Sequence, residues 1–206
     1  GLELESEAEP SPQAEPERLP ELEPAARCVG LRKSFGEREI LKGITLSIPK
    51  HKITVIIGGS GSGKSVLVKH IIGLFQPTQG EVHVLGRDLT QGDAELLRAT
   101  QREVGVLFQG AALFDSMSVR DNIAFPLIEG RRLKRAQVMP KIEEIAKKLG
   151  VDELLERFPD AISNGERKRV GLARALITEP KIMIYDEPTT GQDPIMMKRV
   201  DDMIVE

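Results

Sequence analysis

Eight consecutive residues match a phosphate-binding pattern. They follow the order G-x-x-x-x-G-K-[ST] and are Gly58, Gly59, Ser60, Gly61, Ser62, Gly63, Lys64 and Ser65. Glycines let the backbone curl so that successive N–H groups point at phosphate oxygens, and a helix that follows adds the partial positive charge of its N-terminus. In such a loop Lys64 reaches the β- and γ-phosphates, and the Ser65 hydroxyl binds Mg²⁺. The alternative is a flexible Gly/Ser loop with an incidental lysine, but an apolar run before it and a helical pattern after it favour phosphate binding.

A second apolar run, residues 182–185, ends in two adjacent carboxylates, as a Walker B strand does. Asp186 would hold Mg²⁺ directly or through water, and Glu187 would orient an attacking water and accept its proton. Adjacent acids by themselves often mark only a polar strand end. Together with the phosphate loop they predict hydrolysis of a nucleotide.

Short apolar strands alternate with amphipathic helices around these motifs. The run 53–57 predicts a strand buried on both faces that leads into the phosphate loop, whereas 44–48 and 81–85 alternate like half-buried strands. After the loop, a helix is expected, with an apolar face that ends near Gly73 and Pro77. This order predicts an α/β fold, a parallel sheet core covered by helices.

A helical insertion is expected from about residue 110 to 172. Within it, an apolar stripe at helical spacing is formed by Ile142, Ile145, Ala146 and Leu149. A basic cluster precedes the stripe and contains Arg131, Arg132, Lys134 and Arg135. Since no aromatic platform accompanies it, a solvated face is favoured over nucleic-acid or lipid binding.

The chain carries a formal net charge of −3, but residues 1–25 hold eight Glu and one Arg, so the remainder is at +4. That acidic, proline-rich segment has few large apolar residues and is predicted to be a disordered tail. An acidic docking segment is the alternative. The single cysteine, Cys28, predicts packing and a reducing compartment, and no run is long enough to cross a bilayer. A membrane connection is therefore expected to go through a partner.

Residues 162–166, shortly before the second apolar run, read Ile-Ser-Asn-Gly-Glu and open a helical pattern. This resembles the signature motif of the ABC ATPases, whose usual form is Leu-Ser-Gly-Gly-Gln. Ser163 and Gly165 are retained, while Asn164 and Glu166 differ. Ser163 with Glu166 three residues later is also a capping box, and both interpretations hold because a capped helix N-terminus is itself an anion site.

Further residues resemble landmarks of that family in the same order. Gln109 follows the strand 104–108 as a Q-loop residue does, and Asp193 ends a Gly-Gln-Asp run like the D-loop. The resemblance implies that Gln109 takes part in catalysis with Glu187 and contacts Mg²⁺ with Ser65 and Asp186. It also implies that Phe35 stacks on adenine and that Asp193 lies against the nucleotide.

The resemblance implies a P-loop NTPase fold with a RecA-like parallel core, an antiparallel β subdomain and the helical insertion. It implies ATP and Mg²⁺ as cofactors, and an ATPase that pairs with a second copy, so that each ATP lies between one P-loop and the other signature. It further implies a permease partner, no direct contact with nucleic acid, and a cytoplasmic place on the inner face of the cell membrane.

The amino-acid sequence at residues 65–70, 110–116 and 122–127 is similar to that of ATPases of Mla/MCE-type lipid transporters. This resemblance implies lipid transport and an MCE-type lipid-binding protein as a partner. An importer of another substrate, a soluble ABC ATPase acting on DNA or ribosomes, and a module that binds without hydrolysis remain as alternatives. Neither an inserted coiled coil nor a second cassette, which mark the soluble classes, is present in the sequence.

All three histidines, His51, His70 and His83, precede Asp186. In the family a switch histidine on a later strand contacts the γ-phosphate. The resemblance therefore implies that the domain of residues 26–206 is incomplete at its C-terminus, and that the 206-residue chain binds nucleotide but hydrolyses little of it.

Overall fold

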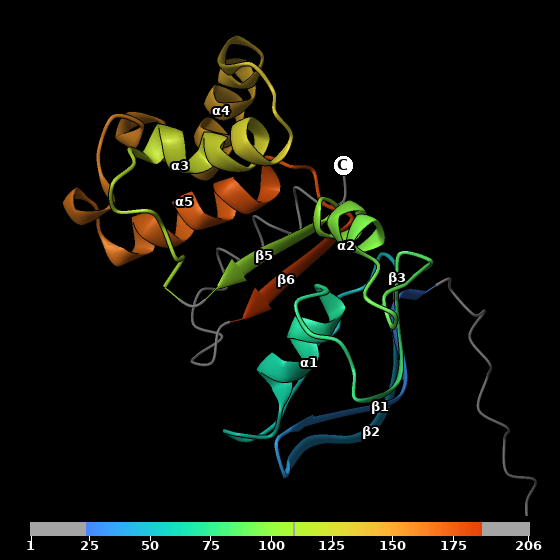
Figure 1. The fold of residues 1–206 in the computed structure, drawn as a ribbon. Helices are drawn as coiled ribbons and strands as arrows, with labels where there is room; N and C mark the ends of the chain where they lie inside the picture. Colours follow the sequence, from blue (N-terminus) through green and yellow to red (C-terminus); the bar gives the residue numbers. More distant parts are fainter. Residues whose placement is uncertain (1–23, 109, 187–206) are drawn as a thin grey trace, which may run out of the picture.

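A computed structural model describes residues 24–108 and 110–186 (Figure 1). The strands are β1 (Pro24–Phe35), β2 (Arg38–Pro49), β3 (Gln79–Val84), β4 (Arg87–Asp88), β5 (Val104–Phe108) and β6 (Ile182–Asp186). The α-helices are α1 (Lys64–Ile71), α2 (Ala94–Gln101), α3 (Val119–Phe125), α4 (Arg135–Leu149) and α5 (Asn164–Leu176). A π-helical turn, Pro126–Gly130, follows α3, and the 3-10 turns Asp152–Leu154 and Pro159–Ala161 lie between α4 and α5. Mixed strands and helices confirm the α/β class.

The first sheet is antiparallel, in the order β2-β1-β3-β4. The hairpin of β1 and β2 turns at Gly36, which has a φ of 58°, and pairs Phe35 with Arg38. Alternation along β1 sends Ala26 and Cys28 inward, as period-two patterning requires. Cys28 is buried and unpaired, which confirms the packing role predicted for it.

The second sheet pairs β5 with β6 in parallel, with Val104 opposite Ile182 and Phe108 opposite Asp186. Both strands therefore end at the same edge. The predicted strand at 81–85 is found as β3 and the one at 44–48 as part of β2, so these predictions are confirmed.

The buried strand predicted at 53–57 is wrong for this structure. The segment has no regular structure, and its side chains face outward, with Ile53 66%, Val55 71% and Ile57 90% exposed. A strand needs a neighbouring ladder to satisfy its backbone groups. Within the described residues, β5 and β6 pair only with each other, so no ladder receives this run.

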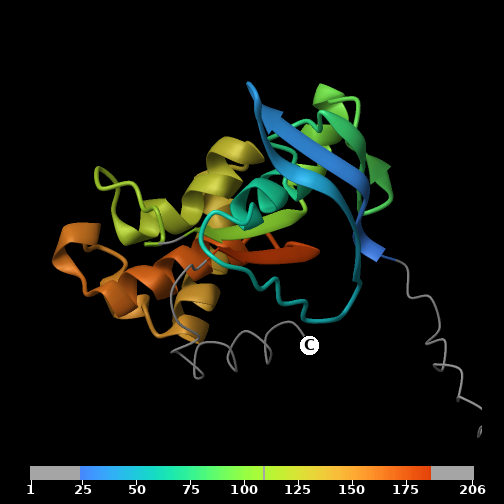
Figure 2. The same ribbon diagram turned by 90° about the horizontal axis from the view of Figure 1, so that it is seen from below.

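Helix α1 packs between the two sheets (Figures 1 and 2). Its buried Leu67 and Ile71 join Cys28 and Val82 of the antiparallel sheet in one apolar cluster, against which Ile184 of β6 packs. The helix ends before Gly73, whose φ of 70° is the left-handed conformation that closes helices. The predicted end near Gly73 is confirmed.

The helices α3, α4 and α5 gather on the other side of β5 and β6 and surround a second apolar cluster (Figure 1). The stripe predicted for α4 is confirmed, because Ile142, Ala146 and Leu149 are fully buried in this cluster and Ile145 packs against it. The helical layer thus contains the end of α5 that carries the signature-like residues. Within the described ranges, none of the helices is both long and apolar enough to span a membrane.

Candidate nucleotide-binding site

The phosphate loop curls at its glycines. Gly61 and Gly63 have φ values of 77° and 93°, which residues with a Cβ rarely adopt. At Gly58 an added Cβ would lie 2.6 Å from Ser62 Oγ, so the Ser62 side chain would have to move. The loop is further closed by a hydrogen bond from Ser62 N–H to Gly59 O at 3.3 Å. The loop geometry therefore explains why glycine occupies these positions.

The N-terminus of α1 is open. Gly63 is its N-cap and provides no side chain, so no side-chain hydrogen bond caps the first turn. Ser65, in that turn, is exposed. Unsatisfied N–H groups and the helix dipole at such an end favour an anion. Loop and helix together therefore fit a phosphate group with its metal ion.

The Lys64 ammonium folds back into the loop. It donates hydrogen bonds to Gly58 O at 2.6 Å and to Gly59 O at 2.8 Å, with Ser62 Oγ at 3.5 Å. The Lys64 ammonium thus already lies against the loop, close to the carbonyl oxygens of Gly58 and Gly59. A phosphate that enters would attract it more strongly than neutral carbonyls do, because a charged acceptor makes the stronger hydrogen bond.

Ser163 and Glu166 form the capping box that the sequence predicted at the start of α5. Ser163 N–H donates to Glu166 Oε2 at 2.7 Å, and Glu166 N–H donates to Ser163 Oγ at 3.3 Å. The Ser163 hydroxyl also donates to Glu166 Oε2 at 2.8 Å. The bond from the Ser163 backbone N–H is the main cause that lowers the pKa of Glu166. Glu166 therefore accepts a hydrogen bond from one of the backbone N–H groups at the start of α5. Gly165 leaves open space beside that helix end, since an added Cβ would meet only Arg169 Nη1, at 3.9 Å.

Phe35 lies at the end of β1 and is 46% exposed, which places it outside the core. Its ring meets the ring of Phe75 edge-on, with 5.5 Å between centroids. The Lys33 ammonium lies 5.3 Å from the Phe35 centroid and 5.6 Å from that of Phe75. The arrangement leaves an exposed aromatic surface beside a cation, and the stacking role of Phe35 stays a prediction.

The remaining predicted site residues are placed as follows. Asp186 ends β6, beside the end of β5. Gln109, Glu187 and Asp193 lie outside the described residues. Ser163 belongs to the helical layer, whereas the phosphate loop precedes α1 in the layer between the sheets, so one chain holds these two groups in separate parts of the fold.

Sequence reasoning missed three residues, two that hold the chain between β5, α3 and α5 and one that packs beside Phe35 at the end of β1. Arg174 donates to the carbonyls of Ala111 and Ala112, buried Asn122 binds the backbone around Phe114, and Phe75 packs against Phe35. No short-range sequence pattern predicts these contacts. A signal existed only for Asn122, because an asparagine in the first turn of a helix can hydrogen-bond nearby backbone groups.

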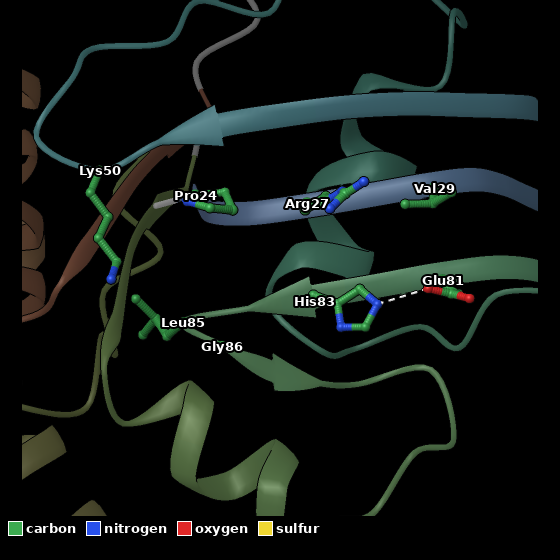
Figure 3. Close-up of a pocket in the computed structure, with 8 residues that line it drawn as sticks. All are labelled: Pro24, Arg27, Val29, Lys50, Glu81, His83, Leu85 and Gly86. Carbon is green, nitrogen blue, oxygen red and sulfur yellow. Dashed lines mark hydrogen bonds and ion pairs between the residues drawn. The ribbon is translucent and has the colours of Figure 1, made fainter. Parts of the chain in front are cut away.

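The outer face of the antiparallel sheet is hollowed by a shallow cavity of about 520 Å³ (Figure 3). Figure 3 shows that Arg27, Lys50 and His83 line it, with His83 hydrogen-bonded to Glu81 at 2.9 Å. None of its lining residues comes from the phosphate loop or from α5. Its surface is therefore separate from the nucleotide-site residues.

The fold and this loop agree with comparisons to known proteins. The profile of the ABC transporter family matches residues 41–190. The chain belongs to the ABC transporter family and corresponds to its ATP-binding domain.

Curated proteins from several organisms are similar to this chain. A probable ribonucleotide transport ATP-binding protein mkl of Mycobacterium leprae is 41% identical over 182 residues, which cover 88% of this chain and 52% of the relative. Protein TRIGALACTOSYLDIACYLGLYCEROL 3, chloroplastic, of Arabidopsis thaliana is 39% identical, covering 86% and 53%. The methionine import ATP-binding protein MetN of Cupriavidus metallidurans is 40% identical, covering 85% and 52%. The chain thus spans about half the length of the curated relatives it matches.

Solved structures agree with this family and fold. CbiO1 of Clostridium perfringens, described as part of the ABC transporter complex cbiONQ, superposes with a TM-score of 0.76 at 27% identity, over 87% of this chain and 73% of that one. The ATP-binding cassette MJ0796, in a dimeric post-hydrolysis state with ADP and Pi, gives a TM-score of 0.75 at 28% identity, over 87% and 81%. The predicted P-loop NTPase fold is confirmed.

Proposed function

We propose that this chain binds MgATP at residues 58–65 and hydrolyses it as the motor domain of an ABC transport system. The observation that carries the proposal is the open N-terminus of α1 behind a glycine-curled loop, with the Lys64 ammonium already drawn to the loop. A positive helix end, backbone N–H donors and a lysine cation are the groups that a triphosphate needs.

Each residue of the loop has a distinct task in binding. The backbone N–H groups of 58–65 surround the β- and γ-phosphates. Lys64 exchanges the carbonyls of Gly58 and Gly59 for phosphate oxygens. Ser65, exposed in the first turn of α1, offers its hydroxyl to Mg²⁺, which neutralises phosphate charge when bound. Phe35 presents its exposed ring to adenine.

Hydrolysis is assigned to residues at the carboxyl ends of β5 and β6, where α/β folds gather ligands. Asp186 would hold the metal ion, and Glu187 would accept the proton of the attacking water. Gln109, the residue after β5, would contact the water and the metal ion, and Asp193 is assigned to the nucleotide. The parallel pairing of Phe108 with Asp186 supports this assignment, because it puts the two strand ends side by side.

A second copy of the chain completes the site. Ser163 and Gly165 stand in the helical layer, apart from their own phosphate loop, so a twofold partner is needed to bring a signature-like helix end to each ATP. The similarity to MJ0796, described as a dimer with ADP and Pi, supports this arrangement.

The test is the substitution Lys64→Ala, with ATP binding measured by calorimetry. Loss of a charge-assisted hydrogen bond of about 1.5–3 kcal/mol raises Kd by roughly tenfold to a hundredfold. Lys69→Ala is the matched control, because Lys69 lies on the same helix and its ammonium lies over the ring of Phe75, 5.3 Å from the ring centroid. An unchanged Kd for Lys64→Ala would refute the nucleotide site.

The cargo is proposed to be a lipid, moved by a permease at the inner face of a membrane with an MCE-type lipid-binding protein. Support comes from the amino-acid sequence at residues 65–70, 110–116 and 122–127, which resembles that of lipid-transport ATPases, and from a relative whose name is that of a galactolipid. Import of a small solute is the second candidate, favoured by the similarity to a methionine import protein.

Crosslinking tests the partner, and stimulation tests the cargo. Cysteines placed at 115–119, where Asp115 and Ser116 are exposed and Val119 is the buried first residue of α3, are expected to crosslink to a membrane protein in native membranes, with the exposed positions reacting first. Crosslinks only to ribosomes or DNA-bound proteins would refute the transport function. With the purified complex in detergent, stimulation of ATP hydrolysis by added phospholipid supports lipid transport, and stimulation by methionine alone contradicts it.

A further inference from the structure

The chain that leaves the end of β5 takes an unusual turn. Gly110, Ala111 and Ala112 have φ values of 71°, 64° and 45°, so consecutive residues are left-handed. Glycine adopts this conformation freely, but the Cβ of alanine disfavours it. Ala112 is exposed, so apolar packing does not hold it in place. The turn, residues 110–112, therefore needs another group to hold it.

Arg174 of α5 is that group. Its Nη2 donates to Ala111 O at 2.7 Å and its Nη1 donates to Ala112 O at 2.9 Å, so one planar guanidinium bridges the two left-handed alanines. The guanidinium also lies 5.7 Å from the centroid of the Phe114 ring. A planar cation is suited to such paired acceptors and aromatic faces, whereas an ammonium is not.

The same face of α5 touches the turn at a second point. Gly171 lies one helical turn before Arg174, and a Cβ added there would lie 2.7 Å from Ala111 Cβ. The helix backbone thus rests directly on the turn. Contacts at Gly171 and Arg174 together fix both the distance and the rotation of α5 relative to the end of β5.

The far end of the loop is fixed by α3. The Asn122 side chain accepts from Phe114 N–H at 2.8 Å, and its Nδ2 lies 3.0–3.1 Å from the carbonyls of Phe114, Met117 and Ser118. The Phe114 ring packs on Phe125, with 4.7 Å between centroids. Because Asn122 is fully buried, the loop between β5 and α3 has fixed points at both ends.

We propose that Arg174 is a positioning residue for ATP hydrolysis: by holding the left-handed turn 110–112, it sets the place of α5, with Ser163 at its start, relative to the strand ends of β5 and β6. The inference rests on the proposed ATPase function. Among residues 24–108 and 110–186, Arg174 donates its hydrogen bonds to Ala111 and Ala112 and not to the phosphate loop, so its loss is expected to act on the rate rather than on nucleotide binding.

The experiment measures ATP Kd by calorimetry, and kcat and KM for phosphate release, in the full-length protein. Arg174→Ala is expected to leave Kd within about twofold and to lower kcat by roughly tenfold to a hundredfold, because small misplacements of reacting groups have effects of this size. Lys141→Ala, which removes an exposed helical cation paired with Glu179 at 2.7 Å, is the control and is expected to keep both values.

A second substitution separates positioning from general damage. Ala112→Gly removes the cost of the left-handed φ without loss of buried packing, so Arg174→Ala/Ala112→Gly is expected to recover part of kcat. If Arg174→Ala does not fold, Arg174→Lys decides, since it keeps the charge and loses the paired contact; its kcat is expected to fall with Kd unchanged.

Two results would overturn the inference. One is an unchanged kcat in Arg174→Ala or, where that variant is unfolded, in Arg174→Lys. The other is weaker ATP binding, seen as a higher Kd, together with a lower kcat, where Ala112→Gly restores neither value. Failure of the proposed function is distinguished from both, because the unsubstituted protein would then bind no ATP or release no phosphate from it.

Discussion

The contact between α5 and the chain after β5 gives a quantitative prediction for Gly171→Ala. The new Cβ would lie 2.7 Å from Ala111 Cβ and 3.0 Å from Leu107 Cδ1, distances below ordinary van der Waals contact. Ala111 and Leu107 are both buried, so neither has free space to enter. Overpacking of this kind costs about 1–3 kcal/mol. Alanine offsets about 1 kcal/mol of it by its better helix propensity.

The control is Gly165→Ala in the same helix. There an added Cβ meets only Arg169 Nη1, at 3.9 Å, which is ordinary contact. Both substitutions carry a propensity gain, so the difference between them isolates most of the packing cost, about 1–3 kcal/mol.

Urea unfolding followed by circular dichroism measures the difference. With a denaturant slope of about 1–3 kcal/mol per molar, the midpoint of Gly171→Ala is expected to lie roughly 1 M below that of Gly165→Ala, with an unchanged slope. Equal midpoints, or a higher one for Gly171→Ala, would show that α5 moves away from Ala111 at little cost. The reasoning from close packing would then be wrong.

Other substitutions test the remaining fixed groups. The Ser163 N–H bond lowers the pKa of Glu166 below its ordinary value of 4.5, so the ionised carboxyl stabilises the fold above that pH and this contribution disappears as the pH falls through the lowered pKa. The urea midpoint is therefore expected to fall more steeply on acidification in the unsubstituted chain than in Glu166→Gln, and parallel curves would contradict this. Burial raises the pKa of Cys28 to about 11, so a thiol reagent is expected to label it only after unfolding; rapid labelling of the native chain would contradict its burial. Asn122→Ala leaves the backbone around Phe114 without partners and is expected to cost about 2–4 kcal/mol in urea unfolding, whereas a cost below about 1 kcal/mol would mean that water replaces the amide.

Local features followed directly from the sequence. The capping box of Ser163 and Glu166 joins residues three apart, and the curl of 58–65 depends on glycines within the loop, so neighbouring residues suffice to specify both. The buried stripe of α4 follows from helical spacing alone. The half-buried strands of the antiparallel sheet are likewise marked by alternation.

The tertiary structure decided the features that depend on distant residues. An apolar run at 53–57 has the composition of a buried strand, yet it becomes one only where a ladder receives it, and the described sheets offer none. Arg174 and the turn 110–112 are more than sixty positions apart, and their contact exists because α5 returns across the end of β5. Short-range sequence patterns determine backbone dihedral angles and helix caps, because the interactions that stabilise them arise within a few residues. The pairing of strands and the hydrogen bonds that hold a loop depend on which distant segments the folded chain brings together.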